Sequence, residues 1–425
     1  MIWGVKPFAS DLSEFLDASP TPFHAVARMR AQLVEAGFRT LRETDDWGGD
    51  LPAGGYVVER NGSTLLAFTW PGGTPETLAL VGAHTDSPNL RPMPNPLGVS
   101  EGYLTLAVQV YGGALLAPWF DRELGLAGRV IVRGADASPE VHLVDSHRPV
   151  GLIPSLAIHL DRKVNSGRAI NPTAEMHVVL GRTSGQAPSW GDWLRGAIDE
   201  FPGGEVLACE LSLYDATPAR ILAPDSWIVS ARLDNLLSCH AACRAMLRAD
   251  AGAFNMLACH DHEEIGSRSW PGAQGDTAVA AIERLVPDPV RRARLLAASL
   301  MLSVDNAHGV HPNFAHKHAA QHRPLLGGGP VLKLDEAQRY AGDSLQIARL
   351  RLLAERADIP LQVFSVRPDM ACGSTIGPIS AANLGLPALD IGVPQWAMHS
   401  VRESASALDA EQLEQLLAAF WSAAG

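Results

Sequence analysis

The sequence contains few cysteines and lacks long apolar runs. Its 5 cysteines are an odd number at irregular spacing, so they do not form a disulfide framework, and we expect a reducing, cytoplasmic environment. Carboxylates at Asp11, Glu14 and Asp17 interrupt the N-terminal segment before an apolar stretch of signal-peptide length can form. No later stretch approaches the roughly 18 uncharged apolar residues of a membrane-spanning helix. We therefore expect neither secretion nor a membrane partner.

Basic residues are also under-represented. The chain of 425 residues has 34 Lys and Arg against 46 Asp and Glu, which gives a formal net charge of -12. Because the acidic residues are spread along the chain and the excess charge is negative, we expect no nucleic-acid partner. P-loop and dinucleotide-binding fingerprints are absent as well, which removes the commonest nucleotide-dependent functions of an α/β chain.

The sequence does have enough apolar material for more than one core. Hydrophobic residues make up 47% and charged residues 19%, with 39 Gly and 30 Pro, a composition typical of a globular protein rich in turns. At this length we expect two domains, or one large domain with an insertion.

Apolar spacing predicts the first elements of the fold. Thr21 and Pro22 resemble a helix N-cap and a first helical residue, and the helical pattern continues until Gly37. Asn61-Gly62 between two apolar runs predicts a β-hairpin, and residues 77–83 predict a buried strand. His84 therefore lies where a strand gives way to a loop.

The pattern of apolar residues, Gly and Pro changes twice along the chain. From about residue 92 to residue 228, short alternating runs divided by Gly and Pro predict an inserted β-rich domain. Residues 1–91 and 229–425 then form a discontinuous domain in which strands alternate with helices. In its second part we expect strands at 254–259, 361–366 and 388–393, and helices at 236–247, 290–303, 337–356 and 410–423. The pattern predicts an α/β fold with a mixed, mostly parallel sheet flanked by helices.

Several segments combine metal-type ligands with strand ends or loops. They contain His84, Asp234, Glu263–Glu264, Asp305 and His399. Alone, each of these residues is more often a hydrogen-bonded structural residue or a cap. Together they supply two His and three carboxylates as ligands, plus one further carboxylate to handle a proton, which is the set that a two-metal hydrolase needs.

The pair Glu263–Glu264 is the most specific of these segments. Adjacent residues in extended backbone point to opposite sides, so one can bind metal while the other faces an attacking water. The alternative is a solvated acidic turn, but an apolar strand leads into the pair. Asp86, two residues after His84, can orient the imidazole by bonding its second nitrogen, or else it is a turn residue before a Ser-Pro pair.

Six motifs resemble those of the aspartyl aminopeptidase family of zinc metallopeptidases. In chain order they are HTDSP (84–88), SARLDNL (230–236), HEEIGS (262–267), VDNAHGVHPN (304–313), CGSTIGP (372–378) and MHSVRE (398–403). The resemblance extends from about residue 8 to residue 422 and includes the insertion. It implies a zinc-exopeptidase-like core that removes the N-terminal residue of peptides, preferentially Asp or Glu.

The resemblance also implies a set of metal ligands and a general base. Two divalent ions per chain, zinc or alternatively manganese or cobalt, are bound by Asp234 as the bridge, His84 and Asp305 at one ion, and Glu264 and His399 at the other. Glu263 then takes the proton of a metal-bridging water.

Substrate contacts and assembly follow from the same resemblance. Lys333, in GGGPVLK, is expected to meet the acidic side chain of the substrate, although a single lysine more often lies at the surface. His159 is expected to reach the site of a neighbouring subunit in a homo-oligomer, a tetrahedral dodecamer built from dimers through the insertion. Two residues depart from the family pattern: Ala231 stands where Pro is usual, and His262 stands where Asn is usual.

Three other interpretations remain open at this point. A broad or neutral-residue aminopeptidase would use the same dinuclear site. Nucleophilic hydrolysis through Cys372 or Ser374 lacks the G-x-S-x-G elbow of such enzymes. A non-enzymatic zinc protein would bind its ion through a cluster that helical packing of small residues also explains: Cys239, His240, Cys243, Cys259 and His260.

Overall fold

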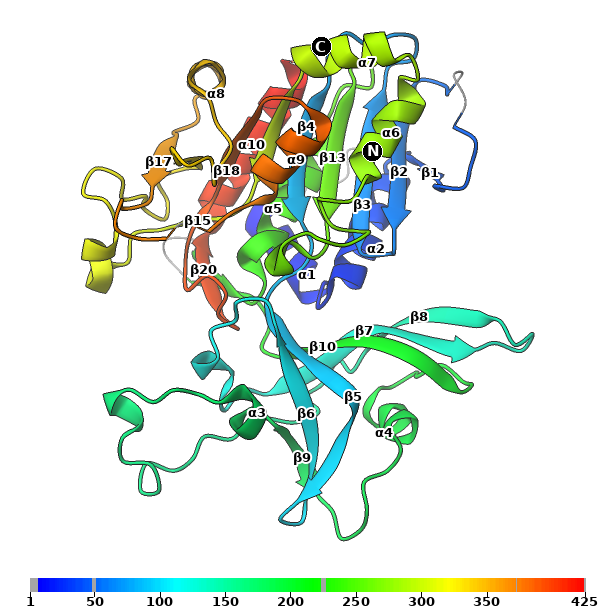
Figure 1. Ribbon diagram of the computed structural model, residues 1–425, viewed down its shortest axis with the longest axis vertical. Coiled ribbons are helices and arrows are strands. Elements are labelled where there is room, and N and C mark those ends of the chain that lie inside the picture. The colour runs from blue at the N-terminus through cyan, green and yellow to red at the C-terminus, as the bar shows by residue number, and fades with distance from the viewer. Residues whose placement is uncertain (1–6, 48–50, 223–226, 372, 424–425) are drawn as a thin grey trace. The chain divides into compact units, whose positions relative to one another are not determined.

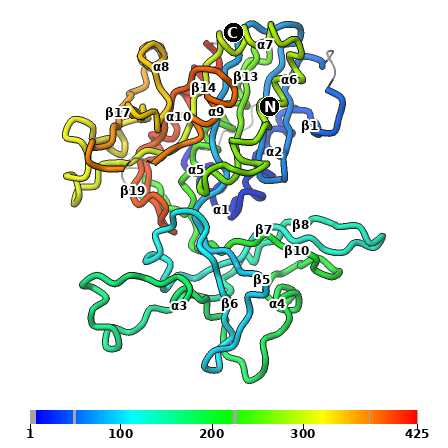
Figure 2. The backbone as a smooth tube through the Cα atoms, viewed as in Figure 1, coloured from blue at the N-terminus to red at the C-terminus, as the bar shows by residue number. Residues whose placement is uncertain are grey.

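The computed structural model describes residues 7–47, 51–222, 227–371 and 373–423. The chain divides into two compact units. The first comprises Met1–Asp86, Ala219–Met398 and Glu403–Gly425, and the second comprises Ser87–Pro218 and His399–Arg402. The chain thus leaves the first unit after residue 86 and returns to it at residue 219, as can be followed in Figure 2. These limits differ by 5 residues at the start and 10 at the end from the expected insertion of 92–228. That residues 1–91 and 229–425 form the catalytic metallopeptidase domain, and that the insertion is a dimerisation or lid domain, stays a prediction.

A mixed sheet of nine strands forms the centre of the first unit (Figure 1). Its strands are β1 (Arg39–Leu41), β2 (Gly54–Arg60), β3 (Thr64–Trp70), β4 (Ala79–His84), β13 (Asn255–His260), β14 (Leu300–Val304), β16 (Val331–Leu334), β17 (Gln362–Ser365) and β18 (Ala388–Gly392). They lie in the order β1-β2-β3-β13-β4-β14-β18-β16-β17. The four central strands from β13 to β18 are parallel, whereas β3 and β16 pair with them antiparallel. The expected mostly parallel α/β sheet is therefore confirmed.

Helices pack on both faces of this sheet and bury two apolar cores. One core includes side chains from α1 (Phe8–Asp17), α2 (Pro22–Glu35), α5 (Leu233–Met246), α8 (Ser344–Arg356) and α10 (Ala407–Ser422), and the other from α6 (Thr277–Leu285), α7 (Pro289–Ala298) and α9 (Ile376–Leu384). Along β4, Val81 lies in the first core and Leu80 in the second, as the alternation of a strand requires. In the described part of the chain, no helix has the length and apolar character to cross a membrane.

The first unit has a second, smaller sheet, which includes two strands that follow central strands of the large sheet. It contains β11 (Arg220–Leu222), β12 (Trp227–Ser230), β15 (Ala307–His308), β19 (Pro394–Trp396) and β20 (Glu403–Ser406), in the order β11-β12-β20-β19-β15. Because β15 directly follows the β14 segment and β19 directly follows β18, this sheet fixes the chain just beyond the carboxyl ends of two central strands.

The second unit is built on an antiparallel sheet of six strands. They are β5 (Asn89–Ser100), β6 (Tyr103–Tyr111), β7 (Leu124–Arg133), β8 (Pro139–Asp145), β9 (Val178–Arg182) and β10 (Val206–Asp215), in the order β8-β7-β10-β5-β6-β9. Two short helices, α3 (Pro172–Glu175) and α4 (Trp190–Ala197), accompany the sheet. Leu126, Val130 and Leu213 are among the side chains that form its separate apolar core.

The predicted helices and strands are correct where residues close in sequence determine the structure. The early helix ends at Glu35 and the hairpin forms with Asn61 and Gly62 at positive φ, both as expected. The helix expected at 290–303 is wrong, because α7 ends at Ala298 and Leu300–Val304 is strand β14. The helix expected from residue 337 begins only at Ser344. The run LMLSV of Leu300–Val304 is compatible with a helix or a strand, and it forms a strand because it is buried between β4 and β18.

Candidate active site

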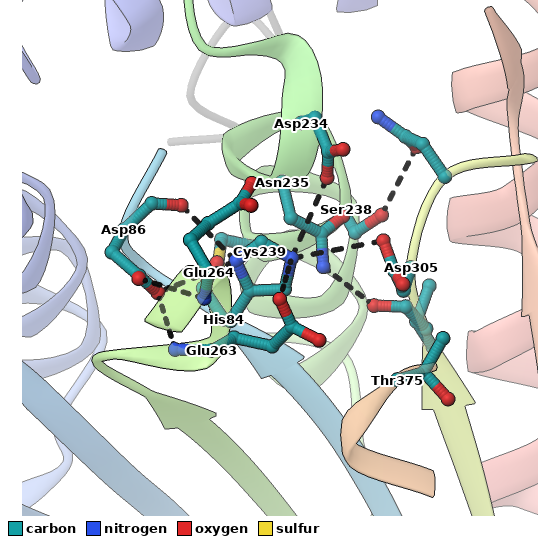
Figure 3. Close-up of polar contacts among 12 residues, drawn as sticks. His84, Asp86, Asp234, Asn235, Ser238, Cys239, Glu263, Glu264, Asp305 and Thr375 are labelled. Carbon is teal, nitrogen blue, oxygen red and sulfur yellow. Dashed lines mark hydrogen bonds and ion pairs between the residues drawn. The ribbon is translucent and has the colours of Figure 1, made fainter. Parts of the chain in front are cut away.

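Five polar side chains converge at the carboxyl ends of the central strands (Figure 3). His84 is the last residue of β4, Asp305 follows β14, Glu263 and Glu264 follow β13, and Asp234 lies in the first turn of α5. His84 Nε2 lies 3.4 Å from Asp234 Oδ1, 3.6 Å from Asp305 Oδ1 and 4.0 Å from Glu263 Oε2. Potential ligand atoms of His84, Asp234 and Glu264 all lie within 4.8 Å of one another. The fold thus brings five residues selected from the sequence into one cluster.

Asp86 supports this cluster through two sets of contacts. Its main-chain carbonyl oxygen lies 3.0 Å from His84 Nδ1, and its carboxylate Oδ1 lies 3.5 Å from the same nitrogen. The carboxylate accepts hydrogen bonds from the main-chain N–H groups of Glu263, at 3.0 Å, and Glu264, at 3.1 Å. Asp86 therefore orients the imidazole mainly through its carbonyl group. Its carboxylate holds the turn that carries both glutamates, a role that the spacing did not predict.

The two glutamates lie in a tight turn and not in extended backbone, so that part of the prediction is wrong. Strand β13 ends at His260, and Glu263–Ile265 form the 3-10 helix η3. His262, just before it, has a left-handed φ of 62°. Non-glycine residues are uncommon in this region and Asn is enriched there, which accounts for the Asn that the family pattern has at this position. The His262 ring contacts Ser269 Oγ through Nδ1 at 2.7 Å, so it is engaged outside the cluster.

The cluster concentrates negative charge in a buried place. Burial, reinforced by neighbouring carboxylates, raises the pKa of Glu263 to about 8 and raises the pKa of Glu264 well above its usual range. Burial alone would lower the pKa of His84, but hydrogen bonding to Asp234, Asp305 and Asp86 raises it well above its usual value. This buried cluster of carboxylates requires positive charge for its stability, which protons or a metal cation can supply.

Lys333 lies in the interior and not in a position to meet a substrate. Lys333 lies on strand β16, and its side chain is 2% exposed. Its Nζ donates hydrogen bonds to the main-chain oxygen of Asp305 at 3.0 Å, to Asp305 Oδ2 at 3.1 Å and to the main-chain oxygen of Asn306 at 3.2 Å. An ammonium group has three N–H donors, and these contacts use all of them. Burial would raise the pKa of Asp305, but the charge of Lys333 and the contact with His84 lower it. The geometry thus corrects the expected role of Lys333, which supports Asp305.

Two of the predicted site histidines belong to the second unit. His399 Nδ1 lies 3.1 Å from the carbonyl oxygen of Gly113, and the His399 main-chain oxygen accepts a hydrogen bond from Leu115. If Nδ1–H donates to Gly113, the lone pair lies on Nε2, the tautomer that metal binding through Nε2 requires. His159 is exposed in a turn at 158–160. Their assigned roles stay predictions.

The cysteine cluster does not form a metal site in the described part of the chain. The one group of potential ligands found there contains no cysteine. Cys239 donates through Sγ to the carbonyl oxygen of His84 at 3.0 Å, and His240 Nε2 lies 2.9 Å from Asp11 Oδ2. Cys372 falls outside the described residues, and Ser374 donates to the Arg339 carbonyl oxygen at 3.4 Å.

A pocket of about 310 Å³ lies beside the segments that carry Asp305 and Lys333. Among the residues that the structure describes, its walls are largely apolar and aromatic, with histidines and two cations and no carboxylate: His308, Gly309, His311, Lys317, His318, Tyr340, Phe364, Ser365, Val366, Arg367, Met370, Ala371, Gly373, Gln395, Trp396, Ala397 and Met398. Tyr340 connects it to the cluster, because Lys333 Nζ lies 4.8 Å from the centre of its ring. Arg367 is paired with Asp369, whereas Lys317 is exposed and, in the described part of the chain, forms no ion pair.

The family match and the most similar relatives point to the same family of proteins. Residues 15–421 match the family described as aminopeptidase I zinc metalloprotease (M18). The chain is 46% identical over 420 residues to a probable M18 family aminopeptidase 2 of Pseudomonas putida strain GB-1, covering 96% of this chain and 97% of the relative. It is 46% identical over 422 residues to a probable M18 family aminopeptidase 2 of Pseudomonas aeruginosa strain UCBPP-PA14, covering 97% of each.

Solved structures with the same fold match nearly the whole length of the chain. The chain superposes with a TM-score of 0.92 on a chain of the cryo-EM structure of the Ape4 and Nbr1 complex, at 34% identity, covering 97% of this chain and 85% of that one. It superposes with a TM-score of 0.85 on the S. cerevisiae mApe1 dodecamer, at 26% identity, covering 97% of this chain and 96% of that one.

Proposed function

The chain belongs to the M18 family of zinc aminopeptidases, and from this premise we propose that it removes acidic N-terminal residues from peptides with two divalent ions and Glu263 as general base. The observation that carries the proposal is the convergence of His84, Asp234, Glu264 and Asp305 around one point, with Glu263 at its edge. This is the donor set of a metal-dependent hydrolase, with a carboxylate left over for proton transfer.

The chemistry of the donors fits divalent metal ions. One imidazole and several carboxylates share a buried cluster whose raised pKa values express a demand for positive charge. Five side chains would hold two ions, zinc first and manganese or cobalt as alternatives: Asp234 as the bridge, with His84, Asp305, Glu264 and His399. When bound, the ions polarise the peptide carbonyl group and lower the pKa of a water molecule.

Glu263 is the group that moves the proton. Its carboxylate lies at the edge of the cluster, 4.0 Å from His84 Nε2, and is 14% exposed, so that water and substrate can reach it. Burial and the nearby carboxylates raise its pKa to about 8 in the metal-free protein, and bound cations would lower it towards the range in which a general base and acid work at neutral pH. Glu263 would accept a proton from the attacking water and return it to the leaving amine. The main-chain N–H groups of Glu263 and Glu264 donate hydrogen bonds to the Asp86 carboxylate, and these bonds hold the turn that positions the Glu263 side chain.

The pocket beside Asp305 is the place for the substrate side chain. Among the described residues no carboxylate lines it, and Lys317 is an exposed cation at its wall, so an Asp or Glu side chain meets positive charge there, with Asp369, the partner of Arg367, as the nearby anion. We therefore assign the contact with the acidic side chain to Lys317 in place of Lys333. The apolar walls, including Phe364, Trp396 and Met370, support a second candidate, an aminopeptidase that also accepts neutral side chains.

Assembly into a dodecamer is the proposed quaternary state. The related mApe1 forms a dodecamer. His159 lies in an exposed turn beside Ile158, which is 47% exposed, and Leu160, which is 75% exposed, and such apolar exposure is typical of a surface that another subunit covers. Within a tetrahedral assembly of dimers His159 would reach the site of a neighbour. Light scattering tests the assembly, and a monomer would refute it.

We also place the enzyme in the cytoplasm. The cysteines in the described part of the chain, Cys209, Cys239, Cys243 and Cys259, are all free thiols. Proteins of oxidising compartments tend to pair their cysteines, so free thiols favour a reducing compartment. Cell fractionation with an antibody against the chain checks this placement.

A panel of chromogenic aminoacyl substrates, assayed with and without chelator, tests the function directly. We expect hydrolysis of aspartyl and glutamyl substrates above leucyl and alanyl ones, complete loss with chelator, and recovery with zinc, manganese or cobalt. Equal rates on all four substrates would favour the neutral-residue alternative. Activity that survives chelation would reject the metallopeptidase mechanism.

A further inference from the structure

Two asparagines cross-link the segments that carry Asp234 and Asp305. Asn235 Nδ2 donates to the carbonyl oxygen of Val304, the residue before Asp305, at 2.7 Å. Asn306 Nδ2 donates to the carbonyl oxygen of Leu233, the residue before Asp234, at 2.8 Å. Each asparagine thus follows one aspartate and binds the peptide group that precedes the other. We propose that Asn235 and Asn306 are a reciprocal pair of positioning residues that set the spacing of the two aspartates and thereby the affinity for metal.

The pair is buried, so water cannot replace its bonds. Asn235 is 0% exposed and Asn306 is 2% exposed. Buried amides are almost always hydrogen-bonded, and the loss of one partner leaves the other without a substitute. The Val304 and Leu233 carbonyl groups would lose these amide donors if the asparagines were shortened. The spacing between α5 and the end of β14 would then depend on the remaining contacts.

Asn306 also belongs to a closed ring of hydrogen bonds that returns to Asp234. Its Nδ2 donates to Gln395 Oε1 at 2.9 Å, and Gln395 Nε2 donates to Glu403 Oε1 at 3.4 Å. Glu403 Oε2 then accepts the main-chain N–H of Asp234 at 3.0 Å. The ring therefore holds the first turn of α5 from two sides, through the Leu233 carbonyl group and through the Asp234 N–H group.

Electrostatics explains why such a cross-link is needed. Asp234 and Asp305 both lie within 3.6 Å of His84 Nε2, and in a buried place like charges repel strongly. Rigid supports hold the carboxylates in the position that a cation requires, so less of its binding energy is used to draw them together. The inference rests on the proposed metal site, but it concerns neutral side chains that bind neither metal nor substrate.

Zinc affinity of the purified full-length protein tests the pair. We would strip the metal and measure zinc binding by competition with a chromophoric chelator, together with the thermal midpoint of the metal-free protein. The variants are Asn235→Ala, Asn306→Ala and both together. The matched control is Asn255→Ala, because Asn255 is 0% exposed and donates to the Asp250 carbonyl oxygen at 3.4 Å, but it begins β13 at the end of the strand away from the site.

We expect each single variant to lose zinc affinity by roughly 10- to 100-fold, the usual effect of removing a residue that supports metal ligands. Because both bonds set one spacing, the double variant should lose less than the product of the single losses. Asn255→Ala should lower the thermal midpoint and leave zinc affinity unchanged.

A lower thermal midpoint with unchanged zinc affinity in both single variants would overturn the positioning role and leave the metal site intact. Wild-type protein that binds no zinc would instead overturn the proposed function, so the two failures are distinguishable. If the alanine variants do not fold, Asn235→Ser and Asn306→Ser, which open smaller gaps, are measured in the same way. The same loss of affinity is expected of them, and unchanged affinity would again reject the pair.

Discussion

The ammonium group of Lys333 binds Asp305 twice, once at its main-chain oxygen and once at its carboxylate, at 3.0 and 3.1 Å. Lys333→Met, which keeps the length of the side chain but removes the charge, should therefore weaken the enzyme through Asp305. We expect kcat/KM to fall by a similar factor, on the order of 10- to 100-fold, on aspartyl and leucyl substrates. A loss confined to aspartyl substrates would restore Lys333 as the residue that reads the substrate.

Lys317 should behave in the opposite way. Its charge lies at the wall of the pocket, so Lys317→Met should lower kcat/KM for aspartyl and glutamyl substrates and leave leucyl substrates nearly unchanged. A hydrogen-bonded charge contact contributes about 1.5 to 3 kcal/mol, which corresponds to roughly a 10- to 150-fold selective loss. Unchanged selectivity in this variant would show that other residues recognise the acidic side chain.

Glu263→Gln should separate catalysis from metal binding. The amide keeps the size of the side chain but accepts no proton, so we expect kcat to fall by roughly 10²- to 10⁴-fold with metal content retained. Metal analysis of the purified variant and its steady-state kinetics check both parts. Glu264→Gln is the comparison, since it should lose metal as well as activity. If Glu263→Gln turned over normally, the assignment of the base would be wrong.

Metal binding to the stripped protein should release protons. Glu263, Glu264 and His84 all have raised pKa values, so the metal-free cluster holds protons at neutral pH that a cation displaces. Zinc affinity should therefore increase as pH rises from 6 towards about 8, the pKa of Glu263. Calorimetric titration in buffers of different ionisation enthalpy measures the number of protons released. A heat of binding that is the same in all buffers would argue against a protonated metal-free site.

His260 should make the protein less stable in mild acid. Burial, and the nearby charge of Arg60, lower its pKa to about 4 from an ordinary value of 6.5. Between these two pH values the unfolded chain binds a proton that the folded chain does not, so stability falls as pH drops, by at most roughly 1.4 kcal/mol per pH unit. Urea unfolding from pH 7 to pH 4 measures the effect. His260→Leu should show a shallower pH dependence, and equal slopes would contradict the assignment.

The sequence predicts the parts of this protein that local chemistry determines. The hairpin follows from Asn61-Gly62, because these residues tolerate positive φ, and the placement of His84 follows from the apolar run before it. Strand β14 could not be predicted in the same way, because four of its five residues are apolar in a manner that suits a helix equally well. Only its neighbours β4 and β18, distant in sequence, determine its state.

The same division holds for the site. The ligand-type residues could be selected from the motifs, whereas their supports could not. Lys333 belongs beneath Asp305 because β16 runs antiparallel to β18, a pairing that spacing in the sequence does not reveal. The repeated Asp-Asn in Asp234-Asn235 and Asp305-Asn306 was the available signal for the asparagine pair. It becomes meaningful only when both segments are seen to exchange hydrogen bonds.

The order of the central strands has a consequence for protein synthesis. Strand β4, which carries His84, lies between β13 and β14, and β14 in turn lies beside β18, although β18 is translated about three hundred residues after β4. A ribosome-bound chain therefore cannot close the sheet, or complete the cluster around His84, until most of the polypeptide has emerged. Translation products truncated before β18 should accordingly be devoid of aminopeptidase activity.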